Sequence, residues 1–280
     1  MTTVAQFRKL QLQFEDQGYV ILPALIEPQV QAAVRCEMEA IVDFLADHLM
    51  SQGRVTDPLK GEPFETRFYD LFKNHLDLAP KNLRFYLHRP GLYGLFFHAP
   101  LLDIVEQLLG PEIRLYPNYS VRPKLPEWSG TQVLWHQDAG YTSGDDAVAG
   151  LRMVNVWTPL VKTTAENGCM QFIPGTHKLG VVRHQQREHY IEIAEEFLNP
   201  RLSQAIDVEL EPGDVVLFNN LLFHAGLPNR SKIVRWSLDW RYQDATQDTM
   251  RRERGHMARS RTSPQSVVAS SRQWAQLWLS

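Results

Sequence analysis

Apolar residues recur at steps of three and four positions in the first third of the chain. The clearest series predicts one face of a helix and comprises Val30, Val34, Met38, Ile41, Leu45 and Leu49. Weaker patterns predict helices over 4–15 and 101–109, and the apolar run 18–23 predicts a strand. Repeated Gly and Pro break up residues 51–95. Residues 1–110 are therefore expected to form a mainly helical support.

Beyond residue 110 the pattern changes to short apolar or alternating runs separated by Gly and Pro. These runs predict strands at 113–121, 133–138, 151–160, 169–173, 208–210, 215–218 and 233–242. Asn167-Gly168 and the turn 211–214 each predict a β-hairpin between their flanking runs. Residues 176–205 are expected to be an insertion, helical over 188–198.

This series of expected strands, separated by Gly/Pro turns, favours a mainly β core with flanking helices, either a sandwich or a barrel. The expected core covers about 111–245, and a tail follows at 246–280. We expect one domain over residues 1–280. Residues 51–95, 140–150 and 176–205 are the expected walls of a substrate pocket.

The composition, 44% hydrophobic and 22% charged over 280 residues, is that of a globular protein with an ample core. The net charge of -3 gives no reason to expect nucleic acid or an anionic membrane as a partner. No apolar run is long enough to span a bilayer and no signal peptide is evident. Cys36 and Cys169 lie far apart, so a cytoplasmic, reducing location is expected.

The candidate chemistry centres on His136 and Asp138, in the stretch 134–138, and on the distant His224. Alternate residues of a strand face the same side, so His136 and Asp138 can converge. Two histidines and one carboxylate favour Fe(II) and leave positions open for a cosubstrate and oxygen. The alternative is an ordinary exposed His/Asp pair and an unrelated core histidine.

A second candidate group lies on the alternating run 233–242. Val234, Trp236 and alternate residues after them share one face, and Arg235 and Ser237 share the other. In the simple interpretation Arg235 faces solvent. In the functional one it enters the barrel, where its guanidinium grips a carboxylate in bidentate fashion and Ser237 adds a hydroxyl.

Further motifs occur in a fixed order along nearly the whole chain. They are residues 14–20, 108–110, Trp135-His136-Gln137-Asp138, 155–160, 167–170, 174–178, 212–214, His224-Ala225-Gly226, Arg235-Trp236-Ser237 and 258–261. In these motifs the sequence resembles the phytanoyl-CoA dioxygenase-like family of Fe(II)/2-oxoglutarate oxygenases. The resemblance implies a double-stranded β-helix, or jelly roll, with iron on His136, Asp138 and His224.

The resemblance also implies 2-oxoglutarate as cosubstrate, with Arg235 on its distal carboxylate and O2 as oxidant. Asn118, Trp157 and Ser237 are implied to lie beside the cosubstrate. The family often has a serine two residues after the distal histidine, where this chain has Gly226. The implied reaction is oxidation of a small-molecule or natural-product-type substrate, chiefly hydroxylation, with succinate and CO2 as coproducts.

Two alternatives remain open at this point. One is a cupin-type metalloenzyme that does not use 2-oxoglutarate, against which Arg235 argues. The other is a non-catalytic small-molecule-binding barrel, against which the complete ligand set argues. Asp138 further argues against a halogenase, because halide usually occupies the position that such a carboxylate would fill. The substrate and the oligomeric state have no recognisable signature in the sequence.

Overall fold

The computed structural model describes residues 4–141, 150–187 and 191–277. Its α-helices are α1 (Val4–Gln17), α2 (Pro28–Ser51), α3 (Phe64–Phe72), α4 (Pro90–Phe96), α5 (Ala99–Leu109), α7 (Glu195–Leu198) and α8 (Ser271–Gln276). Its strands are β1 (Tyr19–Leu22), β2 (Ile113–Leu115), β3 (Ser120–Lys124), β4 (Val133–His136), β5 (Met153–Pro159), β6 (Met170–Ile173), β7 (His184–Gln186), β8 (Ile191–Ile193), β9 (Ile206–Val208), β10 (Val215–Asn219), β11 (Phe223–Gly226), β12 (Arg235–Asp244) and β13 (His256–Arg259).

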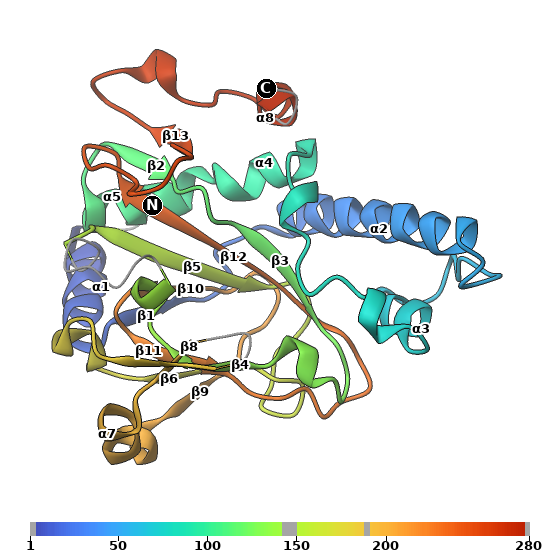
Figure 1. Cartoon of the computed structure of the whole chain (residues 1–280). Helices are drawn as coiled ribbons and strands as arrows, with labels where there is room; N and C mark the ends of the chain where they lie inside the picture. Colours follow the sequence, from blue (N-terminus) through green and yellow to red (C-terminus); the bar gives the residue numbers. More distant parts are fainter. Residues whose placement is uncertain (1–3, 142–149, 188–190, 278–280) are drawn as a thin grey trace.

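Two antiparallel sheets form the core, as a double-stranded β-helix with flanking helices requires. Within the described residues the larger sheet runs β1-β10-β5-β12-β2-β13, with β3 also paired to β12, and the smaller one runs β4-β11-β6-β9. Figure 1 shows the small sheet below the large one, with α2, α4 and α5 on the opposite side of the large sheet. The predicted fold class is confirmed.

Strand β12 separates the hydrophobic core from the interior between the sheets. Trp236, Leu238, Trp240 and Tyr242 are at most 1% exposed and pack with the helices in the main apolar cluster. The alternate residues of the strand, from Arg235 to Gln243, face the other way, toward the small sheet. Trp274 of α8 is also fully buried, as expected of a packing residue.

Helices α4 and α5 contribute much of the apolar cover over the large sheet. No single helix of the described ranges is both long and apolar enough to cross a membrane. Helices α4 and α5, which are bent by 41° relative to each other, are long and apolar enough only when they are counted as one segment.

Neither predicted hairpin forms. Strands β5 and β6, which flank Asn167-Gly168, belong to different sheets, and so do β9 and β10 around the turn 211–214. In both places the turn carries the chain from one sheet to the other. A local turn signal predicts a reversal of direction, whereas the choice of pairing partner depends on how two sheets stack.

Three other segments also differ from expectation. The strand expected over 113–121 is divided into β2 and β3 around Pro117, and β3 extends through Pro123 to Lys124. Such a proline is tolerated because β3 pairs only with β12. In the expected insertion, β7 and β8 pair with each other, and only Glu195–Leu198 is α-helical; residues 188–190 lie outside the described ranges. Strand β13 lies within the expected tail and joins the large sheet.

Candidate metal and cosubstrate site

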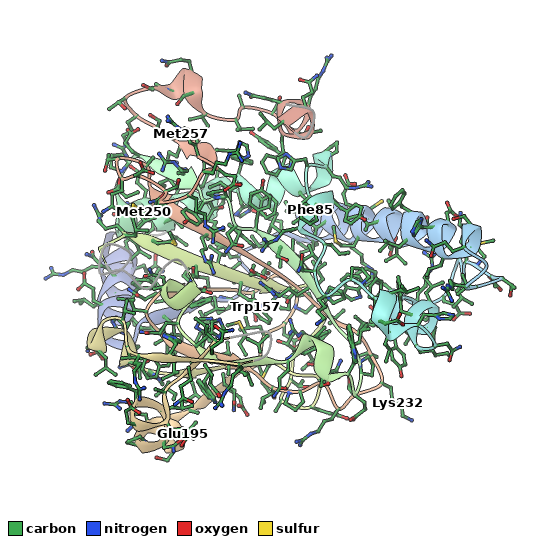
Figure 2. The ribbon with its side chains drawn as sticks, in the orientation of Figure 1. Phe85, Trp157, Glu195, Lys232, Met250 and Met257 are labelled. Carbon is green, nitrogen blue, oxygen red and sulfur yellow. The ribbon has the colours of Figure 1, made fainter. Side chains whose placement is uncertain are left out.

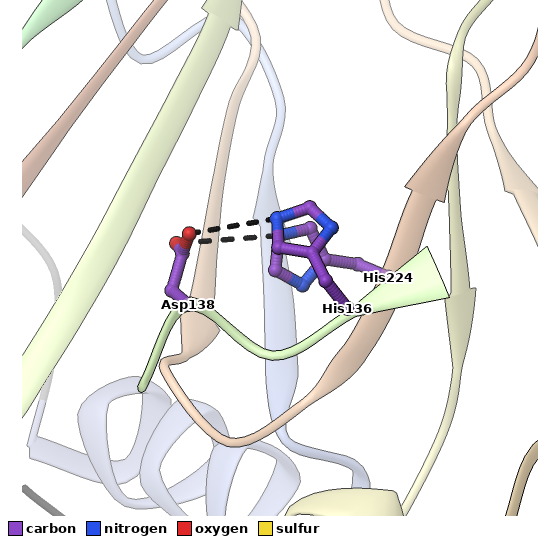
Figure 3. Close-up of side chains that lie close together, drawn as sticks. All are labelled: His136, Asp138 and His224. Carbon is purple, nitrogen blue, oxygen red and sulfur yellow. Dashed lines mark ion pairs between the residues drawn. The ribbon is translucent and has the colours of Figure 1, made fainter. Parts of the chain in front are cut away.

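His136, Asp138 and His224 lie together between the two sheets (Figure 3). One ligand atom from each falls within 4.8 Å of the others. The Nε2 atom of His136 is 3.6 Å from Asp138 Oδ1, and that of His224 is 4.0 Å from Asp138 Oδ2. Both histidines are buried and Asp138 is nearly so. The three side chains form a compact group that could hold one divalent cation.

Strand pairing and backbone hydrogen bonds orient the two imidazoles. His136 is the last residue of β4 and lies directly opposite His224 on β11. The Nδ1–H of His136 donates to the Leu134 carbonyl at 2.8 Å, and that of His224 donates to the Leu222 carbonyl at 2.9 Å. This arrangement fixes the tautomer and leaves each Nε2 as an acceptor for a metal.

Asp138 reaches the group by a route that differs from the expected one. Strand β4 ends at His136, and Asp138 begins a 3₁₀ turn, Asp138–Tyr141. Gln137, fully buried between them, donates to the carbonyls of Gly180 and Leu221 and accepts from the amide of Val182. These three bonds fix the bend. The sequence analysis missed this role of Gln137.

The electrostatics keep Asp138 and His224 in protonation states that can bind a metal. Burial raises the pKa of Asp138, but the Arg241 guanidinium, at 2.6 Å, and the two histidines hold it well below the usual value. Burial, with the neighbouring His136, lowers the pKa of His224 to about 3. Asp138 is thus a carboxylate and His224 a neutral imidazole, as metal binding needs.

Arg235 points into the interior between the sheets, as the functional interpretation expects. It is 4% exposed and its Nη1 donates to the Ser237 hydroxyl. Its guanidinium lies 5.5 Å from the ring centroid of Trp157, which Figure 2 places between the sheets. The buried Nε of Arg235 has no hydrogen-bond partner. A buried cation with an unpartnered donor fits an anionic ligand such as the distal carboxylate of 2-oxoglutarate.

Lys124 is a second buried cation that the sequence analysis missed. It is 2% exposed and pairs directly with Arg235 across β3 and β12. It lies between the strands expected at 113–121 and 133–138. The one sequence signal for Lys124 was its alternation with Arg122 across Pro123, which is typical of a strand. The neighbouring prolines obscured that signal.

Asn118 contacts Arg84 and Tyr116. Its side-chain oxygen accepts from Arg84 at 3.3 Å, and its backbone amide donates to the Tyr116 carbonyl at 2.6 Å. Its predicted contact with the cosubstrate remains a prediction.

The family model for phytanoyl-CoA dioxygenase (PhyH) matches residues 14–237. The chain belongs to this family. The match runs from the last turn of α1 through the first part of β12, and so includes the three candidate metal ligands and Arg235, whereas Arg241 lies beyond its end.

Curated relatives and solved structures agree with this assignment. A 1-deoxypentalenic acid 11-beta-hydroxylase of Streptomyces arenae is 28% identical over 247 residues, covering 83% of this chain and 80% of the relative. A probable phytanoyl-CoA dioxygenase of Caenorhabditis elegans is 27% identical over 61% of this chain and 60% of the relative. EctD of S. alaskensis, crystallised with 2-oxoglutarate and 5-hydroxyectoine, has a TM-score of 0.59 at 20% identity, covering 87% of this chain and 77% of EctD. The structural likeness shows the shared fold.

This family member is a non-haem iron, 2-oxoglutarate-dependent dioxygenase that acts on a small molecule. Its donor set of two imidazoles and one carboxylate suits ferrous iron. The buried, partly unsatisfied Arg235 suits the diacid cosubstrate. O2 completes the set of reactants. The cupin-type alternative without 2-oxoglutarate and the non-catalytic barrel do not explain these features together.

Proposed function

We propose that the protein hydroxylates a small, anionic molecule, with 2-oxoglutarate converted to succinate and CO2. The observation that carries the proposal is the compact group of His136, Asp138 and His224 with the buried Arg235 in the same interior. The iron and the cosubstrate together supply the oxidising chemistry when bound. The protein's own residues bind, orient and shield the reactants.

His136, Asp138 and His224 are the proposed iron ligands and the catalytic residues. Their positions are preset by β4, β11 and the Gln137 hydrogen bonds, so binding requires little rearrangement. Three protein ligands leave one face of the metal for the cosubstrate and oxygen.

Arg235 is the proposed binding residue for the distal carboxylate. Ser237 holds the guanidinium from one side and Trp157 covers its face, so the fork is pre-oriented. Trp157 also packs with Phe172 and Phe218 in an apolar cluster between the sheets, which excludes water from this side of the site. Asn118 is proposed to act through Arg84, from which its side-chain oxygen accepts a hydrogen bond.

Succinate formation tests the reaction class directly. Anaerobically reconstituted Fe(II) protein, exposed to O2 with 2-oxoglutarate, is expected to form succinate. Asp138→Ala and Arg235→Ala are expected to abolish or strongly reduce it. Arg35→Ala is a matched control, because Arg35 lies on α2 and pairs with Glu65. Full succinate formation by Asp138→Ala protein would refute the metal assignment.

The anionic character of the substrate is inferred from an arginine patch beside the proposed metal site, made of Arg84, Arg122, Arg241 and Arg251. Arg122 pairs with Asp239 at 2.5 Å, and Arg241 pairs with Asp138. Within the described ranges, neither Arg84 nor Arg251 has a carboxylate partner.

The patch is compact enough for its charges to interact. Burial, followed by the charge of Arg122, lowers the pKa of Arg84, and Arg251 and Arg241 add to this effect. Arg251 lies over the Tyr116 ring, and its Nε donates to the Tyr116 hydroxyl at 3.1 Å. Clustered guanidiniums repel one another unless an anion lies between them, and their planar forks suit carboxylate and phosphate.

A paired substrate panel tests this part of the proposal. Small carboxylic acids and phosphate esters are compared with their neutral amides or alcohols for stimulation of succinate formation. Acids are expected to stimulate it and their neutral counterparts are not. In an Arg84→Gln/Arg251→Gln variant the KM for an accepted acid should rise about tenfold, as for the loss of charged hydrogen bonds. Equal stimulation by acids and neutral counterparts would refute the anionic class.

A further inference from the structure

Lys124 and Arg235 place two basic side chains next to each other in the interior between the sheets. They are paired residues in the β3–β12 ladder, and they are 2% and 4% exposed. The Lys124 ammonium donates to the Leu227 carbonyl, and Arg235 donates to Ser237. Within the described ranges, no carboxylate pairs with either. Two adjacent buried cations are costly to a fold unless an anion is bound between them.

The Lys124 ammonium lies beside Gly226. A side chain added at position 226 would bring its Cβ to 3.1 Å from the Lys124 Nζ. Glycine at this position therefore leaves room for the ammonium. His224 and Gly226 are alternate residues of β11 and share one face. The two cations and the proposed metal group are therefore neighbours along this face.

We infer that Lys124 is a second binding residue for the distal carboxylate of 2-oxoglutarate, alongside Arg235, and that it occupies the space that Gly226 leaves free. The inference rests on the proposed function. It adds to that function a second cosubstrate-binding residue, which lies on β3 whereas Arg235 lies on β12. The ammonium supplies a rotatable point charge and the guanidinium supplies a planar fork, so together they can hold both oxygens of one carboxylate.

The charged surroundings of Lys124 add a pH dependence to this contact. Arg235 faces it from β12 and the Cys169 thiol faces it from the segment before β6. The Leu227 carbonyl, just after β11, accepts its hydrogen bond, and His224 lies two residues from Gly226 on β11. Burial, and then Arg235, lower the pKa of Lys124 to about 6. Without cosubstrate Lys124 is therefore mostly neutral above about pH 6. An arriving carboxylate favours the ammonium, so cosubstrate binding takes up a proton and weakens as pH rises.

The test compares two ligands that differ only at the distal end. The dissociation constants of 2-oxoglutarate and of 2-oxopentanoate, which has a methyl group in place of the distal carboxylate, are measured by anaerobic titration of the Fe(II) protein without turnover. Lys124→Met is expected to weaken 2-oxoglutarate binding about tenfold to a hundredfold, as for loss of a charge-assisted hydrogen bond. It should leave 2-oxopentanoate binding within about twofold.

Lys162→Met serves as the control, because Lys162 is exposed and pairs with Glu211 at 2.6 Å. It should change neither constant. Lys124→Gln provides a second variant should Lys124→Met not fold. Equal 2-oxoglutarate binding by wild type and a folded Lys124 variant would overturn the inference, as would equal weakening of both ligands. No binding of 2-oxoglutarate by wild type would instead refute the proposed function.

The pH profile gives an independent readout. The wild-type affinity for 2-oxoglutarate should fall between about pH 6 and pH 8.5, while that of Lys124→Met should change little. A wild-type profile parallel to that of Lys124→Met would contradict protonation of Lys124 on binding.

Discussion

The guanidinium of Arg241 lies 2.6 Å from the carboxylate of Asp138. Arg241 is in turn held by Asn155, whose side-chain oxygen accepts from Arg241 Nε at 3.0 Å. Arg241 and Asn155 are paired residues of β12 and β5. The large sheet therefore positions a proposed metal ligand that comes from the end of β4, on the small sheet.

Replacing Arg241 with Met should weaken ferrous iron binding about tenfold to a hundredfold, as is typical for the loss of a group that orients a ligand. Burial raises the pKa of Asp138 once the guanidinium is gone, so protons compete with the metal. The loss should therefore grow as pH falls from 7 to 5.5. Anaerobic competition with a chelator measures it. Arg122→Met is the control, because Arg122 pairs with Asp239; an equal loss in both variants would contradict the role of Arg241.

Arg235→Lys should raise the concentration of 2-oxoglutarate needed for half-maximal succinate formation by about tenfold or more. The charge is kept but the planar fork is lost, and Ser237 can no longer hold it in one orientation. Steady-state kinetics at saturating Fe(II) measure the effect. An unchanged requirement would argue that Arg235 does not contact the cosubstrate.

Lys124→Met should make the cosubstrate-free protein more stable at neutral pH. The Lys124 pKa is about 6 in the folded protein and near 10.5 in the unfolded chain, so the unfolded chain binds the extra proton between these values. Wild-type stability should therefore rise with pH across this window. The Tm advantage of Lys124→Met should be largest near pH 6 and shrink toward pH 9.5. Thermal unfolding at several pH values measures it, and a constant difference would be inconsistent with the lowered pKa.

Gly168→Ala should destabilise the fold more than Gly53→Ala does. Both glycines have positive φ, +87° and +67°, which costs a residue with a Cβ about 1–2 kcal/mol. At position 168 the added Cβ would also lie 2.6 Å from the Leu227 carbonyl oxygen, whereas at position 53 it meets open space. Denaturant unfolding of the two variants separates strain from steric clash. Equal losses of unfolding free energy in the two variants would show that the backbone near Leu227 can shift to accommodate the added Cβ.

Residue types and local alternation were sufficient to predict the candidate site residues and several secondary-structure elements. The spacing of His136 and Asp138, with His224 downstream, made a metal site one candidate, and the alternation around Arg235 left its guanidinium either in solvent or in the barrel interior. Both predictions used residue chemistry and the two-residue period of strands, which holds for Arg235 on β12 but not for Asp138, because β4 ends at His136. The helix over Pro28–Ser51 followed in the same way from its apolar face.

Local sequence patterns could not predict which strands pair with each other. Asn167-Gly168 turns the chain, yet β6 pairs with β9 and β11 and not with β5. A turn fixes the direction of the following strand, but its partner is chosen by which stacking of two sheets buries both apolar faces.

The sequence by itself determined which side chains are candidates for iron binding and which face of β12 is apolar, because residue chemistry and strand periodicity are local properties. Only the tertiary structure decided that Lys124 lies opposite Arg235 and that Arg241 reaches Asp138. Those neighbours are separated by about a hundred residues. Their contacts arise from the packing of whole sheets, on which no short stretch of sequence carries information.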